Sequence, residues 1–294
     1  MPDLRLLVFG GCNIRAPLRR ALQRRRPDSK VNWDDARTDF KIAGPPFFTY
    51  TFGEMLQAIA CYRGDRRIPS ELHALCNKSP RGSPTPANSP IEASDIALAE
   101  PNTSNEIVFD GYHLNRSPVW NLLTPLRRLG PSARRLCSQW YDKGVVGMDE
   151  EARRAAAEAL VALIPEHVPD RELTSAIIGG ARGGRRDPRR GMDCLAKALD
   201  TPLGIVTFTW AYMADGRPVS WPAEFHGQIL GAALELGLPV FEPHRLVRQT
   251  GVAVALGADL RHYREAFMPV IAKPLIEFAH SVASDGRRAA AARS

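Results

Sequence analysis

A single cysteine near the start of the chain occupies a position suited to nucleophilic chemistry. Cys12 follows the apolar segment Leu4 to Phe9 and the pair Gly10-Gly11, and a helical pattern begins after it. The unpaired N–H groups and the dipole at a helix N-terminus favour a thiolate, and the same N–H groups can hold an oxyanion. The alternative role is a small, packed and inert thiol, which is the commoner fate of a free cysteine.

Two further signals lie far from Cys12 in the sequence. Asp259 and His262, in the sequence DLRH, have the spacing at which a carboxylate orients an imidazole and stabilises its charged form. Asn102 follows the apolar segment 95–100, where its amide can donate to an oxyanion or simply form an Asx turn. His244, in FEPHRL, competes with His262 for the role of base but has no carboxylate at that spacing.

The elements that must position these residues read as an α/β pattern. The run 4–9, the glycine turn and a helix over 16–26 predict the strand–turn–helix opening of a parallel sheet, at whose carboxyl edge active sites form. Further predicted strands are 95–100, 203–210 and 240–241, and further predicted helices are 52–62, 118–129, 150–163, 192–199, 224–236 and 266–282. The proline-rich segment 78–90 and the basic, glycine-rich segment 179–191 are predicted to be loops.

Composition and missing motifs exclude several classes of protein. The chain has 294 residues, 44% hydrophobic, 24% charged and a net charge of +7, which is ordinary globular composition with a basic surface. Five cysteines without a CxxC pair predict reduced thiols, and we expect a cytoplasmic protein with no signal peptide and no membrane span. No zinc, dinucleotide or phosphate-loop motif is present, so we expect no metal and no required cofactor.

Taken together, the three signals resemble the SGNH (GDSL-like) hydrolase superfamily. There, a strand ends in F-G-D-S, a later strand ends in G-x-N-D, and a D-x-x-H pair precedes the last helix. This chain has Phe9-Gly10-Gly11-Cys12, then Glu100-Pro101-Asn102-Thr103, then Asp259-Leu260-Arg261-His262. Cysteine therefore replaces the nucleophilic serine, Gly11 replaces an aspartate, and Glu100 replaces a glycine.

The resemblance implies a fold and a set of roles. The fold is α/β, a flavodoxin-like three-layer α/β/α sandwich with a parallel sheet and a helical insertion. Residues 1–103 and 201–283 would form its two halves, 104–200 a helical insertion or cap, and 284–294 a disordered tail. Cys12 would be the nucleophile, His262 the base and Asp259 its support. Asn102 and the backbone at Gly11 and Cys12 would form the oxyanion hole, and Gly53 is a candidate for a further donor.

The implied function is acyl transfer or hydrolysis of an ester, thioester or amide through an acyl-Cys12 intermediate. Arg15 and Glu100 are candidate substrate contacts. In the segment 179–191, Arg185, Arg186 and three neighbouring arginines could receive the phosphates of coenzyme A or the acidic face of an acyl carrier protein. The alternatives are a non-catalytic SGNH-like protein that binds a glycan or an acidic protein partner and, more distantly, a basic nucleic-acid-binding module, which no recognition motif supports.

Overall fold

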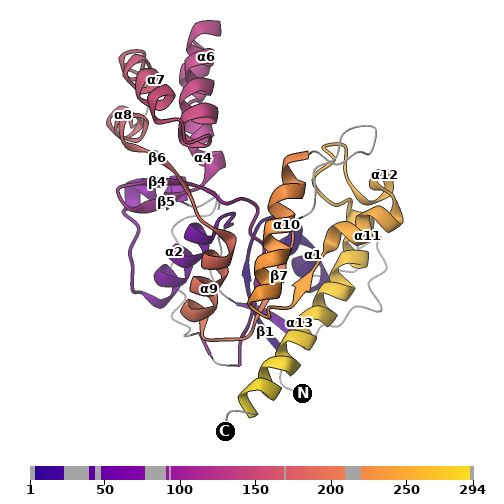
Figure 1. Ribbon diagram of the computed structural model, residues 1–294. Helices are drawn as coiled ribbons and strands as arrows, with labels where there is room; N and C mark the ends of the chain where they lie inside the picture. The colour runs from indigo at the N-terminus through magenta and orange to yellow at the C-terminus, as the bar shows by residue number, and fades with distance from the viewer. Residues whose placement is uncertain are drawn as a thin grey trace.

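The computed structural model describes residues 4–22, 40–43, 48–76, 91–92, 94–168, 170–208 and 220–291 (Figure 1). The predicted proline-rich loop at 78–90 lies outside these ranges, as do the ends of the predicted helix 16–26 and of the predicted strand 203–210.

A five-stranded parallel sheet forms the centre of the molecule. Its order is β2-β1-β3-β7-β8, and every neighbouring pair is parallel. The strands are β1 (Leu4–Phe9), β2 (Phe40–Ala43), β3 (Ile96–Ala99), β7 (Leu203–Val206) and β8 (Val240–Phe241). Because β1 lies between β2 and β3, the strand order reverses there, and the crevice beyond their carboxyl ends is where ligands bind in such sheets. The predicted α/β class is confirmed.

Helices cover both faces of this sheet because alternate strand residues point to opposite sides. Leu6 and Val8 pack with α1 (Cys12–Leu22) and α13 (Met268–Ala291). Leu7 and Phe9 face the helices on the other side, which are α2 (Phe52–Arg63), α9 (Pro188–Leu199) and α10 (Ser220–Glu235). Figure 1 shows α9 and α10 beside the sheet.

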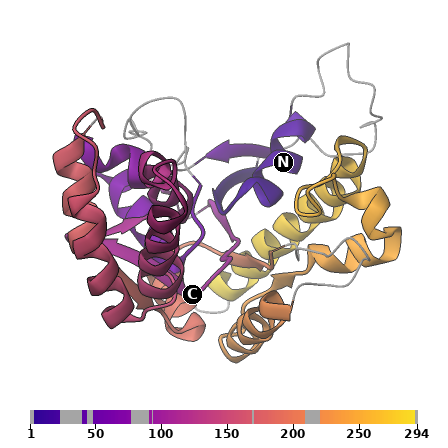
Figure 2. The same ribbon diagram turned by 90° about the horizontal axis from the view of Figure 1, so that it is seen from above.

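The insertion between β3 and α9 is not wholly helical, which corrects the expectation for 104–200. It contains an antiparallel sheet of order β5-β4-β6, made of β4 (Asn105–Phe109), β5 (Tyr112–Leu114) and β6 (Arg182–Arg185). Its helices are α4 (Arg116–Leu122), α5 (Thr124–Arg127), α6 (Pro131–Ser138), the π-helical η3 (Gln139–Val145), α7 (Glu150–Ala162) and α8 (Arg171–Gly180). They share a core with the buried Trp140, and α6, α7 and α8 stand away from the parallel sheet in Figures 1 and 2.

The basic segment 179–191 is likewise not a loop. It forms the end of α8, strand β6 and the beginning of α9. Glycine is required in β6 because a Cβ on Gly183 would lie 2.4 Å from the carbonyl oxygen of Val145. Since α9 packs against α2 and α10 in the core on one face of the parallel sheet, the insertion proper ends before Pro188.

The C-terminal part follows the predicted pattern until its last residues. In this part, the short helices α11 (Pro243–Thr250), α12 (Val252–Ala255) and η4 (Glu265–Phe267) precede α13. Two other short helices, η2 (Ser70–Leu72) and α3 (His73–Cys76), lie earlier in the chain and follow α2. Helix α13 continues to Ala291 and so includes residues 284–291, which we expected to be disordered. Among the described residues, none of the helices combines the length and apolar character needed to cross a membrane.

Candidate functional site

In the turn between β1 and α1, the backbone of Gly10 and Gly11 lies in close contact with the end of β3. A Cβ on Gly10 would lie 2.7 Å from Cγ2 of Ile14 and 2.8 Å from Cβ of Glu100, so only glycine fits there. Gly11 is similarly close to the ring of Tyr50. This tight turn places Cys12, which is partly exposed, as the first residue of α1. The structure thus confirms the predicted location of Cys12 at a helix N-terminus.

Glu100 lies beneath this turn as a buried carboxyl group. Its side chain follows β3, is 1% exposed, and its Oε2 accepts the N–H of Gly11 at 3.0 Å. Burial raises the pKa of Glu100 to about 8, an effect that the hydrogen bond from Gly11 and the charge of Arg15 oppose. The Gly11 N–H that was expected in the oxyanion hole thus donates to Glu100 in this structure.

Arg15 also serves the turn. It is buried, and its guanidinium donates to the carbonyl of Gly10 at 3.3 Å and to the carbonyl of Val8. Burial, and after it the positive charge of the neighbouring Arg19, lower the pKa of Arg15 to about 10. Arg15 and Glu100 thus hold the backbone around Cys12, and their role as substrate contacts stays a prediction.

Asn102 reaches the same turn from the end of β3. Its N–H donates to the carbonyl of Tyr50 at 2.8 Å, and its Nδ2 lies 3.7 Å from the position that a Cβ on Gly11 would occupy. Its Oδ1 is buried and has no hydrogen-bond partner among the described residues. The side-chain amide therefore lies beside the glycine turn that precedes Cys12. The sequence analysis did not single out Tyr50 as a residue of this site. Burial and the nearby Cys12 raise its pKa.

The Asp259–His262 pair forms as predicted, in the loop between α12 and η4. Oδ2 of Asp259 accepts a hydrogen bond from Nδ1 of His262, and Oδ1 accepts the N–H groups of Arg261 and His262, each at 3.1 Å. The His262 bond, followed by the backbone bonds, lowers the pKa of Asp259 to about 2. Because Nδ1 is held by Asp259, Nε2 is the ring nitrogen that can exchange a proton.

One hydrogen bond joins this loop to the start of α1. Nδ2 of Asn13 donates to the carbonyl of Arg261 at 3.3 Å. Asn13 follows Cys12 and Arg261 precedes His262, so the bond holds the nucleophile candidate and the base candidate on neighbouring segments, although 248 residues separate the bonded pair. The predicted residues Cys12, Asn102, Asp259 and His262 therefore belong to one end of the sheet.

Gly53 and the predicted basic segment have other partners. The N–H of Gly53 donates to Oε1 of Glu106 at 2.8 Å, and Nε of Arg186 binds the same oxygen at 2.9 Å. The Gly53 N–H and one of the guanidinium donors of Arg186 are thus both engaged by Glu106. Arg185 lies on β6 with an exposed side chain, and Arg189 pairs with Glu235 at 2.9 Å. The arginines of 179–191 are thus spread over a strand and a helix.

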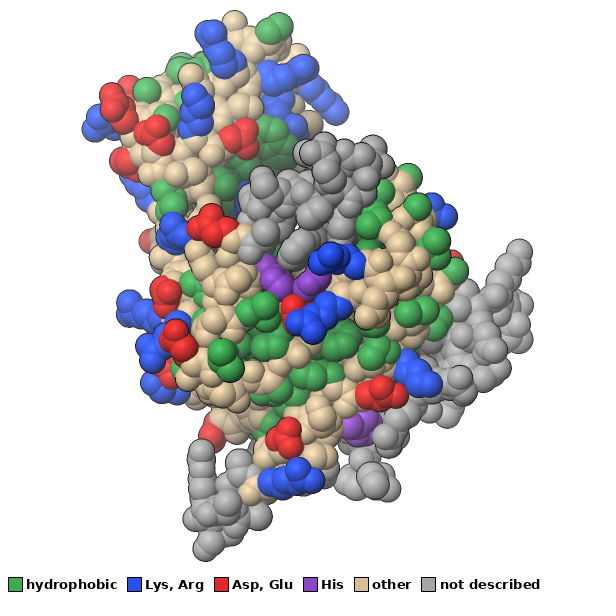
Figure 3. All heavy atoms as spheres, turned by 45° about the vertical axis from the view of Figure 1, so that its right-hand side comes forward, with side chains coloured by type: hydrophobic (Ala, Val, Ile, Leu, Met, Phe, Trp, Pro, Cys, Tyr) green, Lys and Arg blue, Asp and Glu red, His purple; other side chains and the backbone are tan. Residues whose placement is uncertain are grey.

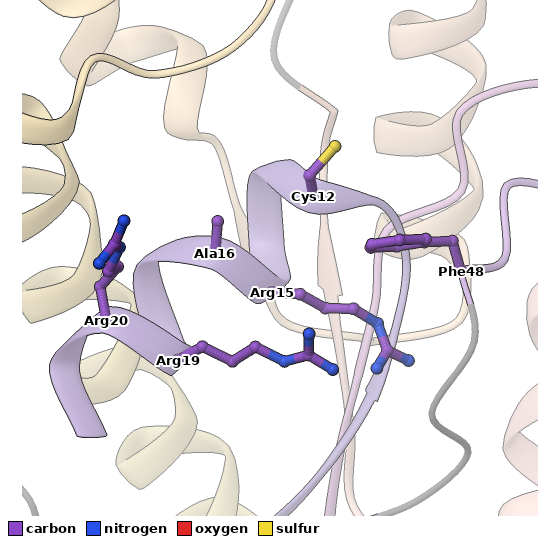
Figure 4. A pocket seen from close by; sticks show the side chains of 6 residues that line it. All are labelled: Cys12, Arg15, Ala16, Arg19, Arg20 and Phe48. Carbon is purple, nitrogen blue, oxygen red and sulfur yellow. The ribbon is translucent and has the colours of Figure 1, made fainter. Parts of the chain in front are cut away.

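A pocket of about 180 Å³ opens beside the first turns of α1. Figure 4 shows Sγ of Cys12 directed away from the guanidinium groups, while Arg15 and Arg19 extend toward the side on which Phe48 lies. Arg20, on the other side, pairs with Glu265 at 3.4 Å. The pocket is lined by Cys12, Arg15, Ala16, Arg19, Arg20 and Phe48. Sequence reasoning missed Arg19 and Arg20, although their spacing from Arg15 and Ala16 on a helix was the signal.

Comparison with known proteins gives one relationship. The family model of the TviD N-terminal domain matches residues 4–278. No curated protein and no solved structure matches the chain. The matched range includes the parallel sheet, the insertion, Cys12 and the Asp259–His262 pair. This chain belongs to the TviD N-terminal domain family.

Proposed function

We propose that this protein transfers or hydrolyses acyl groups through an acyl-cysteine intermediate on Cys12. The observation that carries the proposal is the Asn13–Arg261 hydrogen bond, which joins the helix turn bearing Cys12 to the loop bearing the Asp259–His262 pair. A thiol at a helix N-terminus, an imidazole oriented by a carboxylate and a side-chain amide at the same sheet edge are the parts that nucleophilic acyl transfer needs.

We also propose that the fold is flavodoxin-like and of the SGNH type. Numbered along the chain, the five strands of the parallel sheet have the order 2-1-3-4-5, which is the flavodoxin-like order. Cys12 and Asn102 then follow the two strands that flank the switch point. Helices on both faces of the sheet support the three-layer arrangement.

The reaction would proceed in two steps, acylation of Cys12 and transfer of the acyl group to water or an acceptor. His262 Nε2 takes the proton of the Cys12 thiol, and Sγ attacks the carbonyl carbon of the donor; the bond to the leaving thiolate or alkoxide breaks, and His262 returns the proton to it. In the second step His262 removes a proton from water or from an acceptor hydroxyl, whose oxygen attacks the acyl-Cys12 carbonyl carbon. The C–Sγ bond breaks and the proton returns to Cys12. Asp259 holds the imidazole tautomer throughout.

Asn102 would donate its amide N–H to the oxyanion in both steps. Removal of one such donor typically costs about 10²–10³ in rate. Arg19, which lines the pocket beside Cys12, offers a cation for a phosphate of an acyl-coenzyme A or carrier-bound thioester donor. The family model that matches the chain is named after a protein of Vi antigen biosynthesis.

A second candidate is a non-catalytic protein that binds a glycan or an acidic partner. The observation that favours it is the carboxyl group of Glu100, which takes the Gly11 N–H expected to face an oxyanion. In that case Cys12 would be an unreactive thiol at the mouth of a basic pocket.

Intact-protein mass spectrometry after incubation with acyl-coenzyme A thioesters and activated esters distinguishes the two. We expect one acyl adduct on the wild type, none on Cys12→Ala, and an unchanged adduct on Cys194→Ala, the control with a second partly exposed thiol. No adduct, together with iodoacetamide labelling of Cys12 no faster than that of Cys194, would overturn the enzyme proposal in favour of the binding protein.

A further inference from the structure

Two histidines and a glutamate meet beyond the carboxyl end of the edge strand β8. His226 belongs to α10, Glu242 follows β8 directly, and His244 belongs to α11. Nε2 of His226 lies 3.3 Å from Oε2 of Glu242, and Nε2 of His244 lies 3.8 Å from the same oxygen. One ligand-type atom of each residue lies within 4.8 Å of the others. Figure 3 shows histidines on this face beside acidic and basic side chains.

These separations are close to those of a metal centre. Zinc binds imidazole nitrogen and carboxylate oxygen at about 2.0–2.2 Å, so the ligand atoms of a tetrahedral site lie roughly 3.3–3.5 Å apart. The two nitrogen–oxygen distances here are already near this range. The imidazole rings are 4.6 Å apart and meet edge to face at 88°, an arrangement in which both can turn a nitrogen toward one point.

The surroundings prepare the three side chains for a cation. Both histidines are buried, with exposed fractions of 6% and 5%, so their rings are held by the surrounding elements and largely shielded from solvent. Nη2 of Arg245 binds the other oxygen of Glu242 at 2.5 Å and leaves Oε2 toward the histidines. Arg245 and Arg248 place positive charge near His244, which opposes the binding of a cation. The carboxylate of Glu242 and any further anionic ligand must offset this repulsion.

We propose that His226, Glu242 and His244 bind one divalent transition-metal ion of the zinc class, with a fourth position for water or an external ligand. Two imidazoles and one carboxylate form a donor set typical of zinc sites with an open position. The ligands come from α10, the end of β8 and α11, which is why no short zinc motif appears in the sequence. This site is separate from Cys12 and does not depend on the acyl-transfer proposal.

The proposal is tested by measuring metal binding to the full chain, independently of any enzymatic activity. Protein dialysed against a chelator is titrated with Zn²⁺ in competition with a chromophoric chelator, and Co²⁺ is added separately to record the visible absorption of a tetrahedral site. The variants are His226→Ala, His244→Ala and Glu242→Gln. His167→Ala removes an exposed histidine elsewhere, and Cys12→Ala tests for binding by the reactive thiol candidate.

We expect one equivalent of Zn²⁺ on the wild type and on both control variants, and an affinity at least about 100-fold lower in the three site variants. Circular dichroism checks folding, and the nearly isosteric Glu242→Gln keeps the test decisive where an alanine variant unfolds. Substoichiometric binding by the wild type, affinity unchanged in Glu242→Gln, or binding lost in Cys12→Ala would overturn the proposal.

Discussion

Replacing Glu100 by Gln should remove a large pH dependence of stability. The buried carboxyl has a pKa of about 8 against an ordinary value of 4.5. A carboxyl group whose pKa is raised on folding contributes stability that is fully present below pH 4.5 and is lost as pH rises through 8, because the folded state binds the proton more tightly. Each pH unit between these values corresponds to 1.36 kcal/mol. Gln keeps the shape and the oxygen that accepts the Gly11 N–H but cannot ionise.

The free energy of unfolding of Glu100→Gln, relative to the wild type, should therefore rise by about 4 kcal/mol between pH 5 and pH 9. Urea unfolding curves at five pH values measure it, and the difference between the two proteins cancels every other titrating group. The exposed Glu151→Gln variant should follow the wild type at each pH. A difference between Glu100→Gln and wild type that stays constant within about 1 kcal/mol would refute this account of the buried carboxyl.

Three other substitutions test the contacts around the site. Because the pKa of Asp259 is about 2, its carboxylate is charged from pH 5 to pH 9, and Asp259→Asn should slow Cys12 acylation about 10²–10⁴-fold across that range in a mass-spectrometric time course. Asn13→Ala loses the bond to Arg261 and should slow acylation about fivefold with unchanged circular dichroism; an unchanged rate would contradict the positioning role. Gly53→Ala places a Cβ 2.3 Å from the His113 ring and should lower the unfolding free energy by about 1–3 kcal/mol in urea, with part regained when His113→Ala is added.

Strands β1, β3, β7 and β8 and the main site segments were predictable because their signals are local, whereas β2 was not among the predicted strands. The run Leu4–Phe9 is apolar and ends in two glycines, and β1 and α1 form there. The DxxH spacing separates Asp259 and His262 by three peptide units, which lets the two side chains meet in one turn, and the bond between them forms there. Helix α2 follows the predicted range because its buried residues repeat with helical spacing.

The insertion and the inner contacts of the site were not predictable in this way. Strand β6 reads RGGR, which lacks β-forming residues; it is a strand because it pairs with β4 across a long stretch of sequence. The engagement of Gly11 by Glu100 and of Gly53 by Glu106 depends on contacts 89 and 53 residues apart. Residues 284–291 were expected to be disordered, but this alanine-rich segment extends α13, consistent with alanine's high helix propensity.

The distance along the chain between Cys12 and His262 has a consequence in time. The two residues are 250 positions apart, and the bond that joins their segments spans 248 residues. At a synthesis rate of about 5–20 residues per second, roughly 12–50 seconds pass between the emergence of the thiol and that of the imidazole. On the growing chain the cysteine thus spends this interval without its proposed base, and the proposed site can be completed only after the loop before the last helix has been made.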